Sequence, residues 1–97
     1  MSNFDTPRPL KELLQMMVRR LGWSDDVMEA RIKRGWQTLA GPLIARHTTR
    51  LYVHKRVLYL HVNSAPLRHE LSMGKDRILR RFNEYLGEDY LTDVVIR

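Results

Sequence analysis

The chain of 97 residues contains no cysteine, so disulfides and thiolate metal sites are excluded. It has no apolar run near the ~20 residues that a membrane-spanning helix needs. Its N-terminus lacks the charged start and apolar stretch of a secretory signal. We therefore expect a soluble, cytoplasmic protein that has no membrane partner.

Sequence signatures of catalysis are also missing. Gly35 and Gly41 are too far apart for a glycine-rich phosphate loop, and Gly41 is followed by proline. Neither Ser64 nor Ser72 stands in a nucleophile-elbow context. The four histidines have no acidic partners placed to converge with them on a metal. We expect no enzyme activity, no cofactor and no metal site.

Between Ala30 and His69 the chain has no acidic residue but eight basic ones, Arg31, Lys33, Arg34, Arg46, Arg50, Lys55, Arg56 and Arg68. By contrast, residues 84–97 hold four acids and a single arginine. Arginine outnumbers lysine 13 to 4, and guanidinium groups bind phosphate and stack on bases. Charge of one sign on a folded surface predicts a nucleic-acid partner, with a solvated basic surface as the alternative.

The length allows one domain, which we place at residues 9–97 after a flexible lead-in at residues 1–8. Pro9 suits the start of a helix, and Gly22 suits its C-cap. The apolar residues between them have the spacing of an amphipathic helix and are Leu10, Leu13, Leu14, Met17, Val18 and Leu21.

A second helix is expected to begin at Ser24 as N-cap, with two aspartates in its first turn. Its buried stripe consists of Met28, Ile32, Gly35, Trp36 and Leu39. Gly41-Pro42 ends the pattern, and a short irregular or helical turn at residues 43–45 leads into a sheet.

Alternating apolar residues predict two strands, at residues 49–54 and 57–62, that form a hairpin. If Lys55-Arg56 is a two-residue turn, Tyr52 pairs with Tyr59 and every aliphatic residue except Val57 lies on one face. Neither turn residue favours the positive φ that such a turn requires, so a longer bulged loop stays open.

Ser64 can cap a further helical segment, which runs to Gly87 and is interrupted at Gly74, as one long helix or two short ones. Residues 91–97 predict a last strand with Val94 and Ile96 on one face. The expected fold is α+β, with a single layer of helices on one face of a three-stranded mixed sheet.

The opposite face of that sheet would carry Arg50, Tyr52, His54, Tyr59 and His61. Aromatic residues beside arginine and histidine are typical of proteins that stack the bases of single strands. The same residue types also suit a homodimer face, or a plain half-covered surface, and all three interpretations stay open.

Several short motifs, in their order and spacing, resemble the DciA-like family along nearly the whole chain from Leu10. They are Trp36 with Ala40-Gly41, Ile44-Ala45-Arg46-His47-Thr48, Leu58 to Ser64, Glu70-Leu71, Ile78-Leu79, Asn83 and Leu86-Gly87. The resemblance implies a KH-like fold and a DNA-binding role that assists the bacterial replicative helicase. KH domains clamp RNA backbone with a Gly-x-x-Gly loop, which is absent from the helix junction at residues 72–75.

Together these arguments predict a non-enzymatic, sequence-independent DNA-binding accessory factor in replication, with single strands preferred and the replicative helicase as partner. The alternatives are an adaptor or homodimer that uses the open sheet face, or a module that binds single-stranded RNA. The candidate contact residues are Arg31, Arg34, Arg46, Arg50, Lys55, Arg56, Tyr52 and Tyr59. A second basic cluster at residues 75–81 is diluted by neighbouring acids.

Overall fold

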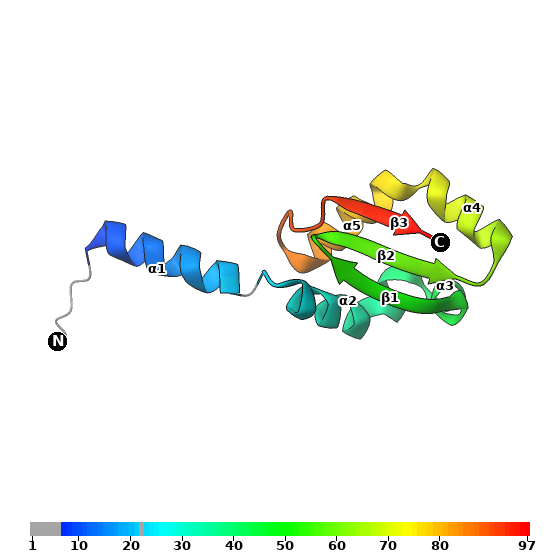
Figure 1. Ribbon diagram of the computed structural model, residues 1–97, viewed down its shortest axis with the longest axis horizontal. Coiled ribbons are helices and arrows are strands. Elements are labelled where there is room, and N and C mark those ends of the chain that lie inside the picture. The colour runs from blue at the N-terminus through cyan, green and yellow to red at the C-terminus, as the bar shows by residue number, and fades with distance from the viewer. Residues whose placement is uncertain (1–6, 22) are drawn as a thin grey trace.

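The computed structural model describes residues 7–21 and 23–97, without the side chains of residues 18–21. Its elements are α1 (Arg8–Leu21), α2 (Asp25–Ala40), α3 (Pro42–His47), β1 (Thr48–His54), β2 (Val57–Val62), α4 (Ala65–Met73), α5 (Lys75–Leu86) and β3 (Asp93–Ile96). Figure 1 shows α1 as a rod that extends away from a body built of all the other elements. The expected α+β order is confirmed, and the segment around Gly74 forms two helices.

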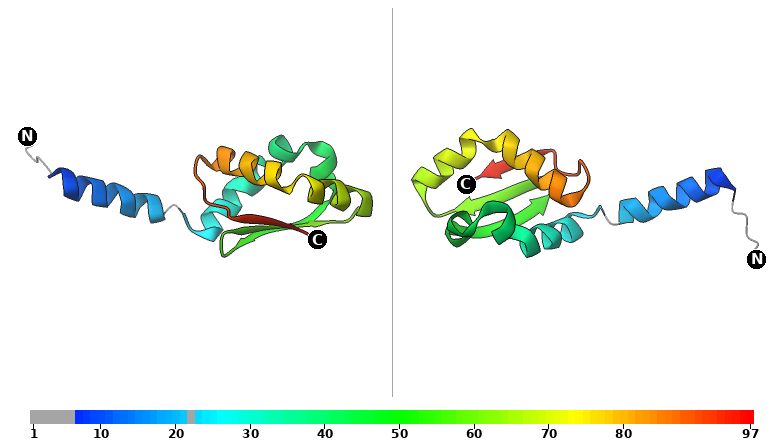
Figure 2. Two further views of the ribbon diagram at one scale, coloured as in Figure 1. Left: turned by 90° about the horizontal axis from the view of Figure 1, so that it is seen from above. Right: turned by 180° about the vertical axis from the view of Figure 1, so that it is seen from behind.

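The sheet has the strand order β1-β2-β3. β1 and β2 are antiparallel neighbours, whereas β2 and β3 are parallel and are joined by a crossover through α4 and α5. Figure 2, seen from above, shows the helices of the body on one side of the sheet and none on the other. The prediction of a mixed three-stranded sheet covered on one face is confirmed.

The hairpin has the predicted register, with Tyr52 opposite Tyr59 and His54 opposite Val57. Lys55 and Arg56 form a two-residue turn, with φ values of 50° and 64°. Positive φ at both positions is what the twist of a two-residue hairpin requires. The longer bulged loop is therefore excluded, although neither residue favours this backbone conformation.

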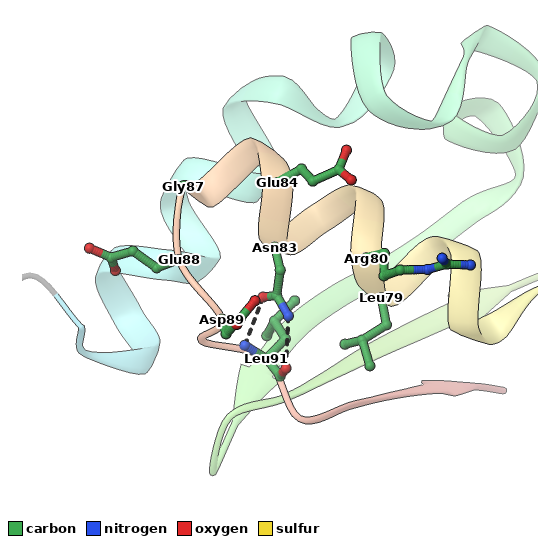
Figure 3. Close-up of a pocket in the computed structure, with 8 residues that line it drawn as sticks. All are labelled: Leu79, Arg80, Asn83, Glu84, Gly87, Glu88, Asp89 and Leu91. Carbon is green, nitrogen blue, oxygen red and sulfur yellow. Dashed lines mark hydrogen bonds between the residues drawn. The ribbon is translucent and has the colours of Figure 1, made fainter.

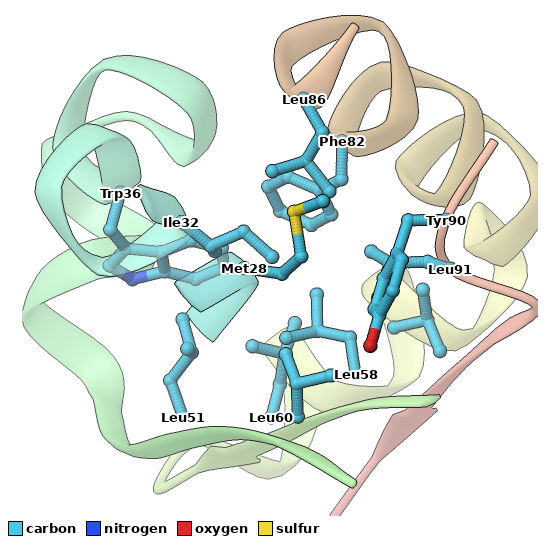
Figure 4. Close-up of a cluster of buried hydrophobic side chains, with 12 residues drawn as sticks. Met28, Ile32, Trp36, Leu51, Leu58, Leu60, Phe82, Leu86, Tyr90 and Leu91 are labelled. Carbon is cyan, nitrogen blue, oxygen red and sulfur yellow. The ribbon is translucent and has the colours of Figure 1, made fainter. Parts of the chain in front are cut away.

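The core lies between the sheet and the helical layer of the body (Figure 4). Trp36 stacks on Phe82 with ring centroids 5.4 Å apart, which joins α2 to α5 above the sheet. The fully buried side chains are Met28, Ile32, Leu58, Leu60 and Val94. On β2 every second residue is buried, so Val57, Tyr59 and His61 are left on the other face, as the alternation predicted.

The helix boundaries follow the expected capping residues. Ser24 accepts a hydrogen bond from the amide of Val27, and Ser64 accepts one from the amide of Leu67. Gly87 ends α5 in the left-handed conformation, and its amide donates to the carbonyl of Asn83. Caps that lie where the sequence places them fix the length of the crossover between β2 and β3.

Helix α1 differs from the expected single layer of helices. Its apolar side chains do not pack on the body, and Leu10, Leu13 and Met17 are 46%, 52% and 53% exposed. The amphipathic pattern thus specified the helix but not its burial. The proposed cap Gly22, the side chains of Val18 and Leu21, and residues 1–6 lie outside the described residues. None of the helices in the described part of the chain combines the length and apolar character needed to cross a membrane.

Candidate nucleic-acid interface

The uncovered face of the sheet carries side chains from all three strands in parallel rows. Paired strands place residues side by side, and residues two apart on one strand share a face. The middle row runs through Tyr52, Tyr59 and Val95, which are register partners on β1, β2 and β3. The next row contains Arg50 opposite His61, with Arg97 beyond them at the end of β3. Two aromatic rings therefore lie beside a row of basic groups.

Four of these side chains form one ladder. The rings of Tyr52 and Tyr59 are stacked with centroids 4.8 Å apart and an angle of 9° between their planes. The guanidinium carbon of Arg50 lies 4.6 Å from the centroid of the Tyr52 ring. That of Arg97 lies 5.0 Å from the centroid of the Tyr59 ring. Each guanidinium is thus held over an aromatic ring by a cation–π contact.

This arrangement changes how the tyrosines can act. Each ring stacks on the other and also contacts a guanidinium, so an incoming base cannot stack on it without displacing one of these partners. The planar guanidinium groups of Arg50 and Arg97 are themselves surfaces on which bases stack, and their donors match phosphate oxygens. The ladder therefore holds the two arginines in place for contact with a nucleic acid.

His61 lies beside the ladder, with its ring 5.8 Å from the ring of Tyr52. Its Nε2 atom is shielded from solvent and has no hydrogen-bond partner among the described residues. Sequence reasoning placed His61 on this face but did not include it, or Arg97, among the contact residues. Arg97 could have been found by extending the alternation of the last strand, in which it shares the face of Val95.

The tip of the hairpin presents one of the two expected cations. Lys55 is exposed and extends past the end of the sheet. Arg56 instead turns back, because its Nε donates to the carbonyl of Tyr90 at 2.8 Å and its Nη2 donates to that of Asp89 at 3.1 Å. Its guanidinium carbon also lies 5.2 Å from the Tyr90 ring centroid. The main role of Arg56 in the fold is to attach the hairpin to the segment that leads into β3.

The arginines of α2 and α3 belong to the helical layer, away from the ladder. Arg31 was expected to point outward together with Arg34, and this is wrong. Its Nη2 donates to the carbonyl of Leu86 at 2.9 Å, where a cation stabilises the carboxyl end of α5. Arg34 and Arg46 are exposed, as expected, but α2 and α3 cover the other side of the sheet. The structure therefore brings together Arg50, Tyr52 and Tyr59, and separates them from the other predicted contacts.

Two acidic side chains of α2 close the free edge of β1. Glu29 Oε1 accepts a hydrogen bond of 2.8 Å from the amide of Val53, and Oε2 pairs with Lys33. Burial would raise the pKa of Glu29, but these two contacts outweigh it and hold the pKa below its ordinary value. Edge strands expose backbone groups on which other strands can add, and Glu29 occupies one such position.

A second hollow lies at the end of α5 on the helical side (Figure 3). It is an open groove of about 720 Å³, lined by Leu79, Arg80, Asn83, Glu84, Gly87, Glu88, Asp89 and Leu91. The Asn83 amide group donates to the carbonyl of Leu91 and accepts from its amide, each at 2.9 Å, and so fixes the segment after α5. With three acids and one arginine, this acidic groove has the opposite charge to the basic row on the sheet.

The described residues contain no group of three or more histidine, aspartate or glutamate side chains that could hold a metal ion. In particular, the histidine beside the ladder has aromatic and basic neighbours on the sheet face. The geometry of the ladder therefore suits anionic and aromatic ligands.

The fold and the sheet face define a small α+β module with one uncovered, basic and aromatic sheet surface. Comparison with known families matches residues 9–96 to the family described as Dna[CI] antecedent, DciA. The chain therefore belongs to the DciA family, as the motifs of the sequence indicated.

Two relatives show how far the similarity extends. A "UPF0232 protein" of Corynebacterium glutamicum (strain R) is 26% identical over 87 residues, which are 90% of this chain and 49% of the relative. A "UPF0232 protein" of Mycolicibacterium paratuberculosis (strain ATCC BAA-968 / K-10) is 27% identical over 90 residues, which are 93% of this chain and 50% of the relative. The chain spans about half the length of these curated relatives.

Proposed function

We propose that the uncovered sheet face binds single-stranded DNA without sequence preference, and that the protein is a non-enzymatic accessory factor of the replicative helicase in the cytoplasm. The observation that carries DNA binding is the ladder of Arg50, Tyr52, Tyr59 and Arg97. The helicase role is supported by membership of the DciA family, whose members assist helicase loading.

The chemistry of binding follows from the ladder. A guanidinium that already lies over a ring loses little conformational freedom when it binds a phosphate, so less free energy is lost on ordering. A base that replaces one guanidinium at the end of the ladder stacks on a tyrosine, which is worth about 1–3 kcal/mol per base. The displaced arginine then binds the phosphate beside that base. None of these contacts reads base edges, so the proposed binding is independent of sequence.

The charges outside the ladder extend the proposed path. Lys55 lies at the hairpin end of the same sheet, and Arg34 and Arg46 offer further cations at its periphery. Arg31 and Arg56 are left out of the proposed contact set, because backbone carbonyls already accept their hydrogen bonds. The central contacts are therefore Arg50, Arg97 and the two tyrosines.

Fluorescence anisotropy with a labelled single-stranded oligonucleotide tests the DNA-binding proposal. If Arg50, Lys55 and Arg97 neutralise three phosphates, the logarithm of the affinity falls with the logarithm of the salt concentration at a slope of about −2. Duplex and RNA oligonucleotides of the same length serve as competitors, and stronger binding of RNA would favour the alternative single-stranded RNA module. Absence of binding even at low salt would overturn the proposal.

A matched pair of variants locates the surface. Arg50→Glu/Arg97→Glu reverses both guanidiniums of the ladder, whereas Arg77→Glu/Arg81→Glu reverses two exposed arginines of α5. We expect the first variant to lose at least tenfold in affinity and to have a shallower salt slope, because each lost phosphate contact reduces the slope by about one unit. Equal effects of the two variants would place binding elsewhere. Co-purification with the replicative helicase tests the second half of the proposal.

The second candidate function uses the same face differently. Tyrosine and arginine are enriched at protein interfaces, so the ladder also suits a homodimer or an adaptor surface. A dimer that buries Tyr52 and Tyr59 excludes DNA from them. Sedimentation of Tyr52→Ala/Tyr59→Ala separates the two, because this variant dissociates a dimer that is formed through the ladder.

A further inference from the structure

Helix α1 presents an apolar surface that no other part of the described chain covers. Leu10, Leu13, Leu14 and Met17 recur at helical spacing, and each is about half exposed. Figures 1 and 2 show α1 extending from the body in every view. An isolated helix of 14 residues is marginal in water, and most of the stability of such helices comes from packing of the apolar face. The stripe therefore needs a partner surface.

The polar face of α1 is basic. Arg8 and Lys11 lie on it, and the one acid of the helix, Glu12, forms an exposed ion pair with Arg8 at 3.3 Å. Residues 8–21 contain four basic residues and this single acid. A suitable partner for α1 therefore combines apolar groups with negative charge.

The acidic groove beside α5 has this combination. Leu79 and Leu91 give it apolar walls, and Glu84, Glu88 and Asp89 surround them with carboxylates. The Oε2 atom of Glu88 is shielded from solvent and receives no hydrogen bond from any described residue. An unpaired carboxylate oxygen of this kind gains most from a cationic donor.

We propose that α1 of a second copy of the chain docks in the acidic groove, and that the exchange is reciprocal. In such a dimer the stripe around Leu13 covers Leu79 and Leu91, while Arg8 and Lys11 face the carboxylates of the groove. Because each copy donates one helix and accepts one, a two-fold axis relates the copies and the assembly closes at two.

The copy's own α1 is a poor occupant of its groove. Three residues, 22–24, connect α1 to α2, and α1 points away from the body that carries the groove. To reach its own groove, α1 would have to reverse direction within this short connection. A second copy supplies the helix without such a reversal.

This dimer differs from one formed through the ladder, because the groove lies on the helical side of the sheet and leaves the uncovered face of both copies accessible. Two DNA-binding faces in one assembly would raise the affinity for long single strands through effective concentration, without any new contact. The inference does not depend on DNA binding, since it rests on α1 and the groove alone.

Charge reversal tests the proposal by sedimentation equilibrium of the full chain. The helix variant is Arg8→Glu/Lys11→Glu, and the groove variant is Glu84→Lys/Asp89→Lys. We expect the unmodified chain to form a dimer of twice its 11.6 kDa mass, and each variant alone to raise the dissociation constant at least tenfold. An equimolar mixture should dimerise again, because the acidic helix of one variant then meets the basic groove of the other.

Two controls keep the outcome decisive. Arg34→Glu/Arg46→Glu changes the net charge of the chain as much as the helix variant does, but at exposed positions away from α1 and the groove, and should dimerise normally. Circular dichroism of each variant shows that the body is folded. A monomer at all concentrations, a dimer that persists in both variants, or a mixture that stays monomeric would each overturn the proposal.

Discussion

The carboxylate of Asp25 accepts a hydrogen bond of 2.7 Å from the backbone amide of Lys55, 30 residues later in the chain. Its other oxygen accepts from the amide of Arg56 at 3.2 Å and from the hydroxyl of Tyr90. One side chain therefore joins the start of α2, the hairpin turn and the segment before β3. Burial would raise the pKa of Asp25, but the hydrogen bonds outweigh it and hold the pKa below its ordinary value.

Replacing this carboxylate should destabilise the whole body. We expect Asp25→Ala to lower the free energy of unfolding by about 1–3 kcal/mol, because it leaves the half-buried hydroxyl of Tyr90 and the turn amides without their acceptor. Urea denaturation at pH 7, followed by tryptophan fluorescence, measures the change. Asp26→Ala is the matched control, since Asp26 lies in the same first turn but is exposed. A loss no larger than that of the control would contradict this role for Asp25.

The hydroxyl of Tyr90 makes the fold sensitive to alkali. Burial and the hydrogen bond to Asp25 raise its pKa from 10.0 to about 12. Between these pH values the unfolded chain ionises Tyr90 while the folded chain keeps it protonated, so unfolding becomes easier as the pH rises. The contribution lost amounts to about 2–3 kcal/mol. Denaturation at pH 8 and pH 12 should show that the difference between the unmodified chain and Tyr90→Phe shrinks, and a constant difference would argue against the shifted pKa.

The hairpin turn has residues that do not suit its backbone. Lys55 is exposed and has a φ of 50°, a conformation that asparagine adopts more readily than lysine. We expect Lys55→Asn to raise the free energy of unfolding by about 0.5–1 kcal/mol, while it removes one proposed phosphate contact. Thermal unfolding and anisotropy on the same sample should therefore move in opposite directions. A variant that unfolds more easily would mean that the lysine side chain stabilises the turn.

The contact between α2 and α5 depends on a glycine. A Cβ atom at Gly35 would lie 2.6 Å from the hydroxyl oxygen of Tyr85, which donates to the carbonyl of Arg31. Gly35→Ala should lower the free energy of unfolding by about 1 kcal/mol, because Tyr85 has to move away. In a Tyr85→Ala background the same substitution should raise it by a similar amount, since alanine favours a helix more than glycine does. The same sign in both backgrounds would show that Tyr85 does not set the cost.

Local patterns predicted most of the body. The alternation of β1 and β2 specified the hairpin register and the residues of the open face, because one face of the sheet is buried and a slip of one residue would reverse it. Ser24, Ser64 and Gly87 marked helix ends, because capping depends on residues close in sequence. These features follow from short-range chemistry.

Long-range contacts decided what the sequence could not predict. Arg31 and Arg56 resemble any other exposed cation in the sequence, but the carbonyls of Leu86 and Tyr90 lie close to them only in the folded chain. Arg97 reaches the ladder because β3 pairs with β2 in parallel, and no local pattern specifies strand order. In the same way, the apolar stripe of α1 predicts that a surface must cover it, but not where that surface lies.

Nuclear magnetic resonance tests the central claim most directly, namely that the open sheet face is the DNA-binding surface. A labelled sample is titrated at low salt with a short thymidine oligonucleotide, and amide shifts are followed residue by residue. We predict the largest shifts at residues 50–61 and 95–97, with the amides of α2 and α4 nearly unchanged. Shifts confined to the helical layer, or none at all, would contradict the account.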